Sequence, residues 1–217
     1  DIMTERFEVT TRIQKALSLK SDLFGTLLDG SPSAPAISKV SVHHLSKIVS
    51  GKPLVRPAWF LDTDQQGEGI VDVTTHLVDL VQWEAFPDQI IDSSEVKIVS
   101  AKRWTTSLSL QQFKKITGLD EYPEYLQKDV KSDTLSIYCN GEINYTLKGK
   151  HAKVSVIWDY QAPEGSGDTH HSSMRGSKSD LIIIQGVTEN YKPTLYVVAK
   201  EMEGFESKLN QAIKSLQ

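Results

Sequence analysis

The sequence predicts an α+β fold: an open, mostly antiparallel sheet with helices packed on one face. Segments with helical spacing of apolar residues gather in the first half of the 217 residues, and segments with alternating apolar residues follow in the second half. The Asn140-Gly141 pair is typical of the tight turn between antiparallel strands. These observations favour one layer of helices on one layer of sheet, which leaves the second face of the sheet open.

Five segments are predicted to be helical because their apolar residues recur at intervals of three or four. The first is capped by Thr4 or Asp1, the second is closed by Gly51, the third is stopped by Pro87 and the fourth ends at Gly118. In chain order the segments are residues 4–19, 39–49, 70–86, 109–117 and 200–216.

Strands are expected where apolar residues alternate with polar ones or where proline favours an extended edge. Residues 135–139 and 143–147 flank Asn140-Gly141, and residues 154–160 continue the alternation, so the three segments are predicted to form an antiparallel meander. Two stretches rich in Gly, Pro, Ser and Asp are expected to be loops. The other predicted strands are residues 52–60, 95–107, 181–186 and 195–199, and the loops are residues 25–35 and 162–171.

The charge and hydropathy of the chain exclude several classes of partner. Twenty-four Lys and Arg stand against 28 Asp and Glu, which gives a net charge of −4 and a pI near 5.9, so no nucleic-acid partner is expected. No apolar run approaches the roughly 20 residues that cross a bilayer, so no membrane interaction is expected. Cys139 is the one cysteine, which excludes an internal disulfide and a cysteine-based zinc site.

The two ends of the sequence suggest a part of a longer protein. The chain starts at Asp1 instead of methionine, and the last predicted helix runs almost to Gln217. We therefore expect residues 1–217 to form a single α+β domain whose partner domain lies outside this sequence.

One acid and one imidazole share a face of the predicted helix 70–86. Asp72 and His76 are four residues apart and Asp79 follows three residues later, so the three side chains lie above one another on a helix. The helix is apolar nearly all round, which implies burial, and buried polar groups must satisfy each other or a ligand. Two interpretations stay open: a catalytic site, or a structural hydrogen bond between His76 and Asp72.

The residues around this pair resemble a known signature. Residues 67–80 are similar to the segment of the Gfo/Idh/MocA oxidoreductases in which a Gly-x-Gly turn precedes Asp-x-x-x-His-x-x-Asp. Residues 173–181 are similar to the Gly-Thr-Lys-Gly segment that precedes a late strand of that family, and Asn140-Gly141 falls where the family has a hairpin. The resemblance covers about residues 1–199, lies within the C-terminal substrate domain of the family, and is strongest to a bacterial branch.

The resemblance implies a role for each member of the pair. His76 matches the histidine that acts as general base on a sugar or polyol hydroxyl, and Asp72 matches the acid that orients the imidazole and shares its proton. An imidazole with an ordinary pKa near 6.5 suits proton transfer at neutral pH. Thr75, between the two, is expected to contact the substrate.

The resemblance also implies an NAD or NADP cofactor in the full-length protein. Family members begin with a Rossmann domain, whose glycine-rich turn binds the pyrophosphate and which contributes a lysine from a Glu-Lys-Pro motif. Neither motif occurs in this sequence, so we expect the cofactor to be bound mainly by that missing domain and none by this chain alone. No metal is expected, because the nicotinamide performs the redox step. Arg6 lies near a family arginine and is the one cofactor-binding candidate here.

Three further residues are candidates for substrate binding. Trp59 lies shortly before the Gly-x-Gly turn and could stack on a sugar ring, although core packing is an equal alternative. His171, beside His170 and Asp168 in a predicted loop, contacts a sugar or a metal in one interpretation and solvent in the other. Arg175 belongs to the second resembling segment.

Together these observations predict the substrate-binding and catalytic-base domain of an NAD(P)-dependent sugar or polyol oxidoreductase, active only as the full-length protein. The open sheet face is expected to contact another copy of the chain, giving a homo-oligomer, or the missing Rossmann domain. His43 and His44 are expected to be surface and helix-packing residues. The alternative function belongs to another class: a non-catalytic carbohydrate-binding or protein-interaction module with the same fold.

Overall fold

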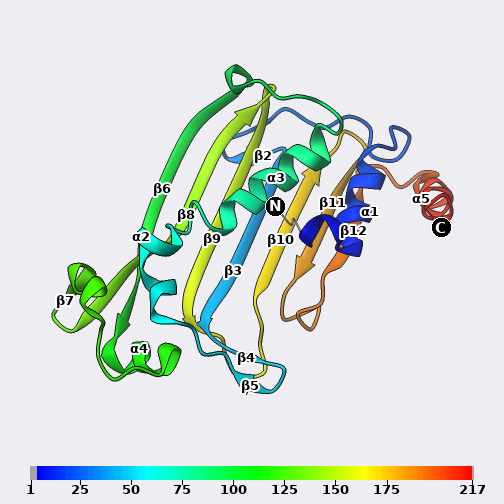
Figure 1. Ribbon diagram of the computed structural model, residues 1–217. Helices are drawn as coiled ribbons and strands as arrows, with labels where there is room; N and C mark the ends of the chain where they lie inside the picture. Colours follow the sequence, from blue (N-terminus) through cyan, green and yellow to red (C-terminus); the bar gives the residue numbers. More distant parts are fainter. Residues whose placement is uncertain (1–3, 217) are drawn as a thin grey trace.

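The computed structural model describes residues 4–216, which are built around one eight-stranded sheet (Figure 1). Seven strands lie side by side in the order β12-β11-β10-β3-β9-β8-β6, and the short β7 pairs with β8. Neighbouring strands are antiparallel except β3 and β9, so the predicted fold class is confirmed. The strands are β3 (Ile37–Ser46), β6 (Val96–Ser109), β7 (Val130–Lys131), β8 (Thr134–Leu147), β9 (Lys150–Gln161), β10 (Thr169–Arg175), β11 (Ser179–Gln185) and β12 (Thr194–Ala199).

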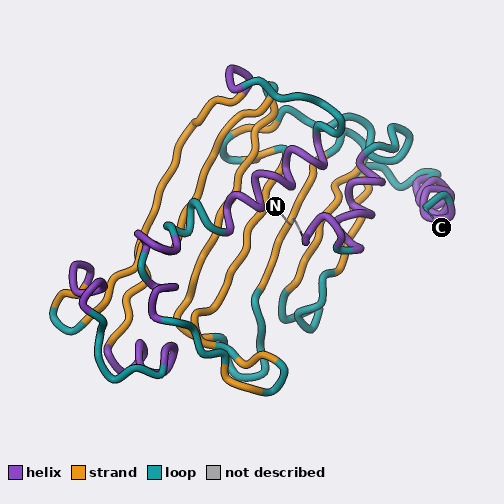
Figure 2. The backbone as a smooth tube through the Cα atoms, in the orientation of Figure 1, coloured by secondary structure: helices purple, strands orange, loops and turns teal. Residues whose placement is uncertain are grey.

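The helices gather on one face of the sheet (Figures 1 and 2). There α1 (Val9–Ser18) packs on β11, and α3 (Val73–Ala85) packs on β9 and β3. Within residues 4–216, no helix is long and apolar enough to cross a bilayer. The remaining elements are α2 (Thr63–Gln66), α4 (Leu110–Thr117), α5 (Phe205–Lys214), the 3-10 turns η1 (Thr4–Phe7), η2 (Ala58–Leu61), η3 (Ser93–Glu95) and η4 (Glu124–Asp129), and two hairpins, β1 (Gly30–Ser31) with β2 (Ala34–Pro35) and β4 (Ile48–Val49) with β5 (Lys52–Pro53).

The helix predicted for residues 39–49 is wrong, because this segment forms the central strand β3 and then β4. Val42, Leu45 and Val49 happen to have helical spacing. The odd-numbered residues from 37 to 41 are all buried on the helix-covered face, which is the period of a strand. Pairing with β10 on one edge and with β9 on the other satisfies the backbone of β3, and this outweighs the local helical pattern.

The turn predicted at Asn140-Gly141 is also wrong. Both residues lie inside β8, which continues without a break through them. The chain reverses instead at Lys148-Gly149, where both φ angles are positive, as a two-residue hairpin turn requires. The predicted meander therefore loses one strand, and β6, β8 and β9 form the antiparallel run.

Tertiary contacts explain why this Asn-Gly pair is not a turn. The Asn140 side chain links two strands, since its Nδ2 donates to the carbonyl of Trp104 at 3.1 Å and its Oδ1 accepts from the backbone N–H of Trp158 at 2.7 Å. Gly141 lies against Ile70, and a Cβ at position 141 would be 2.7 Å from the Cβ of Ile70. Asn140 is therefore required for hydrogen bonds between strands, and Gly141 for the close approach of Ile70.

Most other predicted elements are confirmed within a few residues, including β6, β9, β11 and β12. The helix α4 has both of its predicted ends. Ser109 and Gln112 form a reciprocal capping box, with Oγ accepting at 3.3 Å and Oε1 accepting at 2.8 Å from the two backbone N–H groups. Gly118 closes the helix with φ +79°.

Several predicted boundaries shift. The helix predicted from residue 70 begins at Val73, because the preceding residues form a turn. The loop predicted to reach residue 171 ends at Asp168, so His170 and His171 are strand residues of β10. The first helix is capped by the side chain of Glu8, and the proposed cap Asp1 lies outside the described residues. Residues 52–60 are mostly irregular, with β5 at one end and η2 at the other.

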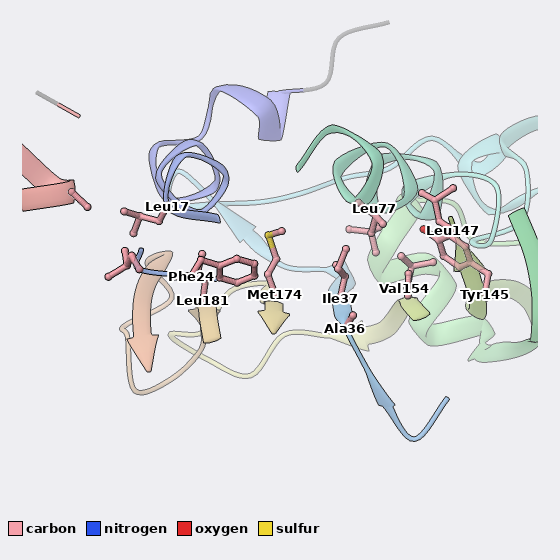
Figure 3. Close-up of a cluster of buried hydrophobic side chains, with 14 of the residues drawn as sticks. Leu17, Phe24, Ala36, Ile37, Leu77, Tyr145, Leu147, Val154, Met174 and Leu181 are labelled. Carbon is pink, nitrogen blue, oxygen red and sulfur yellow. The ribbon is translucent and has the colours of Figure 1, made fainter. Parts of the chain in front are cut away.

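Two apolar clusters lie between the helices and the covered face of the sheet. The larger lies under α1 and α3, where side chains from both helices meet residues of β3, β9, β10 and β11 (Figure 3). The second lies under η2 and α4 at the other end of β8 and β9. The residues labelled in Figure 3 are Leu17, Phe24, Ala36, Ile37, Leu77, Tyr145, Leu147, Val154, Met174 and Leu181.

A buried polar network crosses the larger cluster. Lys39 of β3 and Glu84 of α3 form an ion pair, with Nζ 3.0 Å from Oε1 and 2.8 Å from Oε2, and both side chains are almost fully buried. Lys39 also donates to Ser172 Oγ at 2.7 Å, and Ser172 donates to Gln14 Oε1 at 3.0 Å. Gln14 Nε2 donates to the carbonyl of Leu181 at 3.0 Å. The network joins two helices to three strands.

Removing one member of the ion pair is expected to destabilise the domain strongly. Burial raises the pKa of Glu84 and the Lys39 charge opposes this, so Glu84→Leu alone leaves a buried, unpaired ammonium. We expect the free energy of unfolding to fall by about 3 to 5 kcal/mol, measured by urea denaturation. The double variant Lys39→Met/Glu84→Leu is expected to recover most of this loss, because no buried charge remains.

The exposed pair of Lys114 and Asp120 provides the control. Lys114→Ala is expected to change the free energy of unfolding by less than about 1 kcal/mol, because solvent screens that pair. A Glu84→Leu variant as stable as this control would contradict the prediction.

Candidate active site

The Gly-x-Gly turn holds the start of α3 close against β8. Gly67 has φ +89°, a conformation that favours glycine. Gly69 donates its N–H to the carbonyl of Tyr138 at 3.1 Å, and a Cβ on Gly69 would lie 1.7 Å from the carbonyl oxygen of Cys139. Thr74 Oγ1 donates to the carbonyl of Gly69 at 3.1 Å. The turn therefore fixes the first turn of the helix relative to the sheet.

Asp72 and His76 line two different cavities. Asp72 precedes α3 with ψ −93°, outside the helical region, so the regular stacking predicted for the pair begins only after it. It borders a space of about 20 Å³ beside Phe60 and Trp158. His76, in the first turn of the helix, lines a cavity of about 250 Å³ that we call the His76 cavity.

The His76 cavity is formed where η1, α1, β3, α3 and β10 meet. Three carboxylates and three imidazoles are among its lining residues, and its described lining contains neither lysine nor arginine. An uncharged, hydrogen-bonding molecule suits such walls better than an anion. The polar lining residues are Glu5, Glu8, Thr10, Thr11, Ser41, His43, His76, Asp168, Thr169, His170 and Gln185.

Asp168, at the end of the loop before β10, gathers three donors at one wall of the cavity. His43 Nδ1 lies 3.2 Å from Oδ2, His44 Nδ1 lies 3.1 Å from Oδ1, and Lys47 forms an ion pair with Oδ2. Burial acts to raise the pKa of Asp168, but the hydrogen bonds from His43, Lys47 and His44 and the Lys47 charge outweigh it and hold the pKa well below its usual range. The carboxylate is therefore ionised at neutral pH and accepts from both imidazoles.

His170 is a neutral imidazole at the same cavity. Its Nδ1 lies 2.8 Å from Ser41 Oγ, in a hydrogen bond between β10 and β3. Burial, followed by the charges of Lys39 and of neighbouring histidines, lowers the pKa of His170 to about 3. This ring therefore presents one donor and one acceptor, without charge.

The structure does not bring the other predicted substrate residues to the cavity. Thr75 is exposed on α3, and its Oγ1 donates to the carbonyl of Asp72 at 2.7 Å. Trp59 is half exposed in η2 and packs edge-on against Phe60. His171 and Arg175 alternate with the buried residues of β10 and so face the open side of the sheet. These four residues do not line the His76 cavity.

Arg6, the predicted cofactor residue, pairs with Asp79 of α3. Its Nε donates to Asp79 Oδ2 at 2.7 Å, and its Nη2 contacts the other carboxylate oxygen. The guanidinium also lies 5.8 Å from the ring of Trp83, which Lys15 approaches to 3.9 Å. Arg6 thus joins the N-terminal segment to the same face of α3 that carries His76.

Sequence reasoning missed Ser41 and His43 as members of the site, and it named Asp168 only beside His170 and His171, in a predicted loop that contacts a sugar or a metal in one interpretation and solvent in the other. The sequence pattern predicts a helix around His43 and a separate loop around Asp168, so it does not predict that the two side chains meet. One signal is present: Lys39, Ser41 and His43 alternate with two valines at positions 40 and 42, which is a strand pattern with polar residues on one face.

The residues present at the start of α3 do not fit the pyrophosphate of a dinucleotide. A helix N-terminus binds phosphate through free backbone N–H groups and a positive potential. Here the carboxylate of Asp72 stands at that position, so negative charge occupies the end of the helix. Within residues 4–216 no group of three or more His, Cys, Asp or Glu residues is arranged to hold a metal ion.

The open sheet with helices on one face, and the Gly-x-Gly turn leading to Asp72 and His76, are the arrangement that the resemblance to the C-terminal domain of the Gfo/Idh/MocA oxidoreductases implies. The family described as "Putative oxidoreductase C terminal domain" matches residues 13–217, and the chain belongs to it.

Solved structures agree with this assignment. A "putative oxidoreductase" from Parabacteroides merdae is 57% identical with a TM-score of 0.95, and the match covers 100% of this chain and 50% of that one. The chain therefore spans half the length of that relative. No curated protein matches the chain.

Two distant structures share the fold alone. A "putative oxidoreductase" from Erwinia carotovora atroseptica is 12% identical with a TM-score of 0.55, and the match covers 98% of this chain and 56% of that one. The transcriptional regulator Gal80p from Kluyveromyces lactis is 12% identical with a TM-score of 0.50, and the match covers 92% of this chain and 44% of that one.

The stability of the domain is expected to depend on the ionisation of His170. A histidine has a pKa near 6.5 in an unfolded chain, whereas the folded pKa is about 3, so between these values the unfolded state binds the extra proton. Stability should therefore fall as the pH falls from about 6.5 towards 3, by up to about 1.4 kcal/mol per pH unit from this group. Urea unfolding at several pH values should give a shallower slope for His170→Gln than for wild type.

Ser41→Ala is the control for this measurement, because it removes the hydrogen bond to His170 but keeps the titrating ring. It is expected to lower stability without flattening the pH dependence. Parallel curves for wild type and His170→Gln would contradict the prediction.

A methyl group at position 69 is expected to displace the start of α3. Gly69→Ala places a Cβ against the backbone of Cys139, and relief of such overlap costs roughly 1 to 3 kcal/mol or more. Urea denaturation should report the lost stability, and amide chemical shifts of the first turn of α3 should change. Gly118→Ala is the matched control: it meets open space, so only the left-handed φ costs energy and the shifts near α3 stay unchanged.

Proposed function

We propose that this chain supplies the general base and one substrate-binding wall of an NAD(P)-dependent oxidoreductase that acts on a sugar or polyol. The observation that carries the proposal is His76, placed by a Gly-x-Gly turn at the wall of a hydrogen-bonding cavity in a domain of an oxidoreductase family. Such a cavity suits a molecule with several hydroxyl groups.

His76 takes the proton in this proposal. Oxidation of an alcohol to a carbonyl removes a hydride, which a nicotinamide accepts, and a proton, which a base must accept from the hydroxyl. Imidazole suits this role near neutral pH. The helix α3 is anchored by the buried Glu84 two turns beyond His76, so the ring stands on a rigid element.

Asp72 acts on this base through its charge and position. It lies at the end of the turn that fixes α3, four residues before His76, and a negative charge there stabilises the imidazolium that proton transfer creates. The charge of Asp72 also reaches Arg56, where burial lowers the pKa of the guanidinium and the charges of Asp168 and Asp72 oppose that decrease.

The cofactor is assigned to a separate nucleotide-binding domain of the full-length protein, because the start of α3 does not suit a pyrophosphate. This chain then supplies proton transfer and substrate orientation, and the other domain supplies the nucleotide site and the lysine expected from the family resemblance. We also propose that the open face of the sheet contacts a second copy of the chain.

Loss of the base is expected to slow turnover with little effect on the nucleotide. In the full-length protein, His76→Ala should lower kcat by roughly 10² to 10⁴ on the true substrate, because a positioned general base contributes about that much. Asp72→Asn should lower kcat by a smaller factor. Cofactor affinity, measured by titration calorimetry, should stay nearly constant, because the nucleotide sits on the other domain.

His151→Ala provides a matched control, since this histidine of β9 does not line the cavity. It should turn over substrate at the wild-type rate. Wild-type turnover in His76→Ala would remove this histidine from the mechanism, and a full-length protein that binds sugar without oxidising it would favour the non-catalytic module.

A further inference from the structure

We infer that a groove between α1, β12 and α5 is the docking surface for an apolar segment of the half of the full-length protein that precedes this domain. The groove has a volume of about 820 Å³ and lies beside the outermost strand at one edge of the sheet (Figure 1). Its described lining shares no residue with that of the His76 cavity. The inference goes beyond the proposed function, because it concerns an interface and does not depend on turnover.

The helix α1 supplies one wall of the groove. Val9, Ile13 and Ala16 are four and three residues apart, so they share one side of the helix, and all three line the groove. Val9 is 64% exposed. Leu195 and Val197 of β12 line the groove as well, and both are only partly buried. This wall and the neighbouring strand are therefore apolar and accessible.

The C-terminal helix supplies another wall. Leu209 and Ile213 of α5 and Leu216 just after it are four and three residues apart, and all three line the groove. Ile213 is 44% exposed and Leu216 39%. The buried residues that attach α5 to the core are Phe205 and Ala212. A ten-residue helix is only marginally stable by itself, so an occupant that covers this stripe also stabilises α5.

The chemistry of the groove selects an apolar occupant. Exposed apolar side chains that gather in one place mark interaction surfaces in proteins. Arg12 is the one charged residue among the described lining residues. A protein segment with apolar side chains suits these walls, whereas a sugar or a nucleotide would find few polar partners.

The length of related proteins indicates where this segment comes from. The chain belongs to a family described as a C-terminal domain, and it matches only 50% of the Parabacteroides merdae protein. We therefore expect a preceding half of similar size in the full-length protein. That half joins the described structure at η1, only a few residues before Val9. Such a short tether keeps it at a high local concentration beside the groove.

A second copy of this chain fits the groove less well. In a two-fold dimer, the same surface of each copy meets its counterpart. Two grooves placed together would leave the space between them unfilled. The exposed residues of α5 that could enter a neighbouring groove are polar, including Glu206, Lys208 and Lys214.

Photo-cross-linking in the full-length protein tests the occupant directly. Ile213→p-benzoylphenylalanine places a photoreactive ring in the groove. Ile48→p-benzoylphenylalanine is the matched control, because Ile48 is 64% exposed and belongs to the β4–β5 hairpin, outside the described lining (Figure 1). We expect position 213 to link to a peptide of the preceding half, in a product of single-chain mass, at a yield at least tenfold above that of position 48.

Hydrogen exchange of the full-length protein gives an independent measurement. Val9→Asp introduces a charge on the α1 wall and is expected to displace the occupant, so the amides of α5 should exchange at least tenfold faster. Exchange in the core strand β9 should stay unchanged, which shows that the domain remains folded. Val55→Asp is the control, since Val55 is 63% exposed and does not line the groove, and it should leave α5 unchanged.

Contrary results overturn the inference in different ways. Products of double-chain mass from position 213 would assign the groove to a second copy. Links to the preceding half that are no more frequent from position 213 than from position 48 would show that this half does not dock there. Unchanged exchange of α5 in Val9→Asp, or an equal increase in Val55→Asp, would show that no occupant connects the two walls. Because none of these results depends on substrate oxidation, the inference and the proposed function fail independently.

Discussion

The buried ion pair of Lys39 and Glu84, extended by Ser172 and Gln14, determines how the two main helices sit on the sheet. Its four members come from β3, α3, β10 and α1, which are also elements that line the His76 cavity. On each element a cavity residue lies within a few positions of the network residue. The buried network therefore fixes the relative positions of the elements that form the cavity.

Burying such a network costs more desolvation free energy than burying apolar side chains of the same size. Its contribution is therefore to fix the positions of the helices on the sheet. Charged and amide groups bond only in particular directions, and a helix that slid along the sheet would leave a charge unpaired in the core. Apolar contacts of Leu77 and Leu17 with the same strands tolerate such movement far better. The role proposed for His76 depends on this constraint, because the cavity keeps its lining from α3, β3 and β10 only while the helix stays in place.

Sequence patterns predicted the elements whose signals are local. The capping box at Ser109 and the glycine after it define α4, and the alternation of β11 and β12 is plain in the sequence. Predictions failed where residues are chosen for tertiary contacts. Asn140 and Gly141 hydrogen-bond and pack inside β8 and do not form a turn, and the buried polar residues of β3 obscure the alternation of apolar and polar residues that is typical of a strand. For the site, the Gly-x-Gly turn located His76 correctly at the start of α3. The sequence does not predict which polar residues share the cavity with His76, because strand pairing brings Ser41 and His170 together.

Side chains of β10 alternate between the two faces of the sheet, and this alternation decides which of them face the His76 cavity. His170, Ser172 and Met174 face the helices, while His171 and Arg175 face the open side, and antiparallel pairing sets Ser172 opposite Lys39. A shift of one residue would exchange the two sets, and it would also take Ser172 out of the buried network. Lys39 keeps its polar partners only in the observed register of β10. This register places the neutral imidazole of His170 at the cavity and the imidazole of His171 on the open face of the sheet. Sequence patterns mark both histidines equally; the core of the molecule distinguishes them.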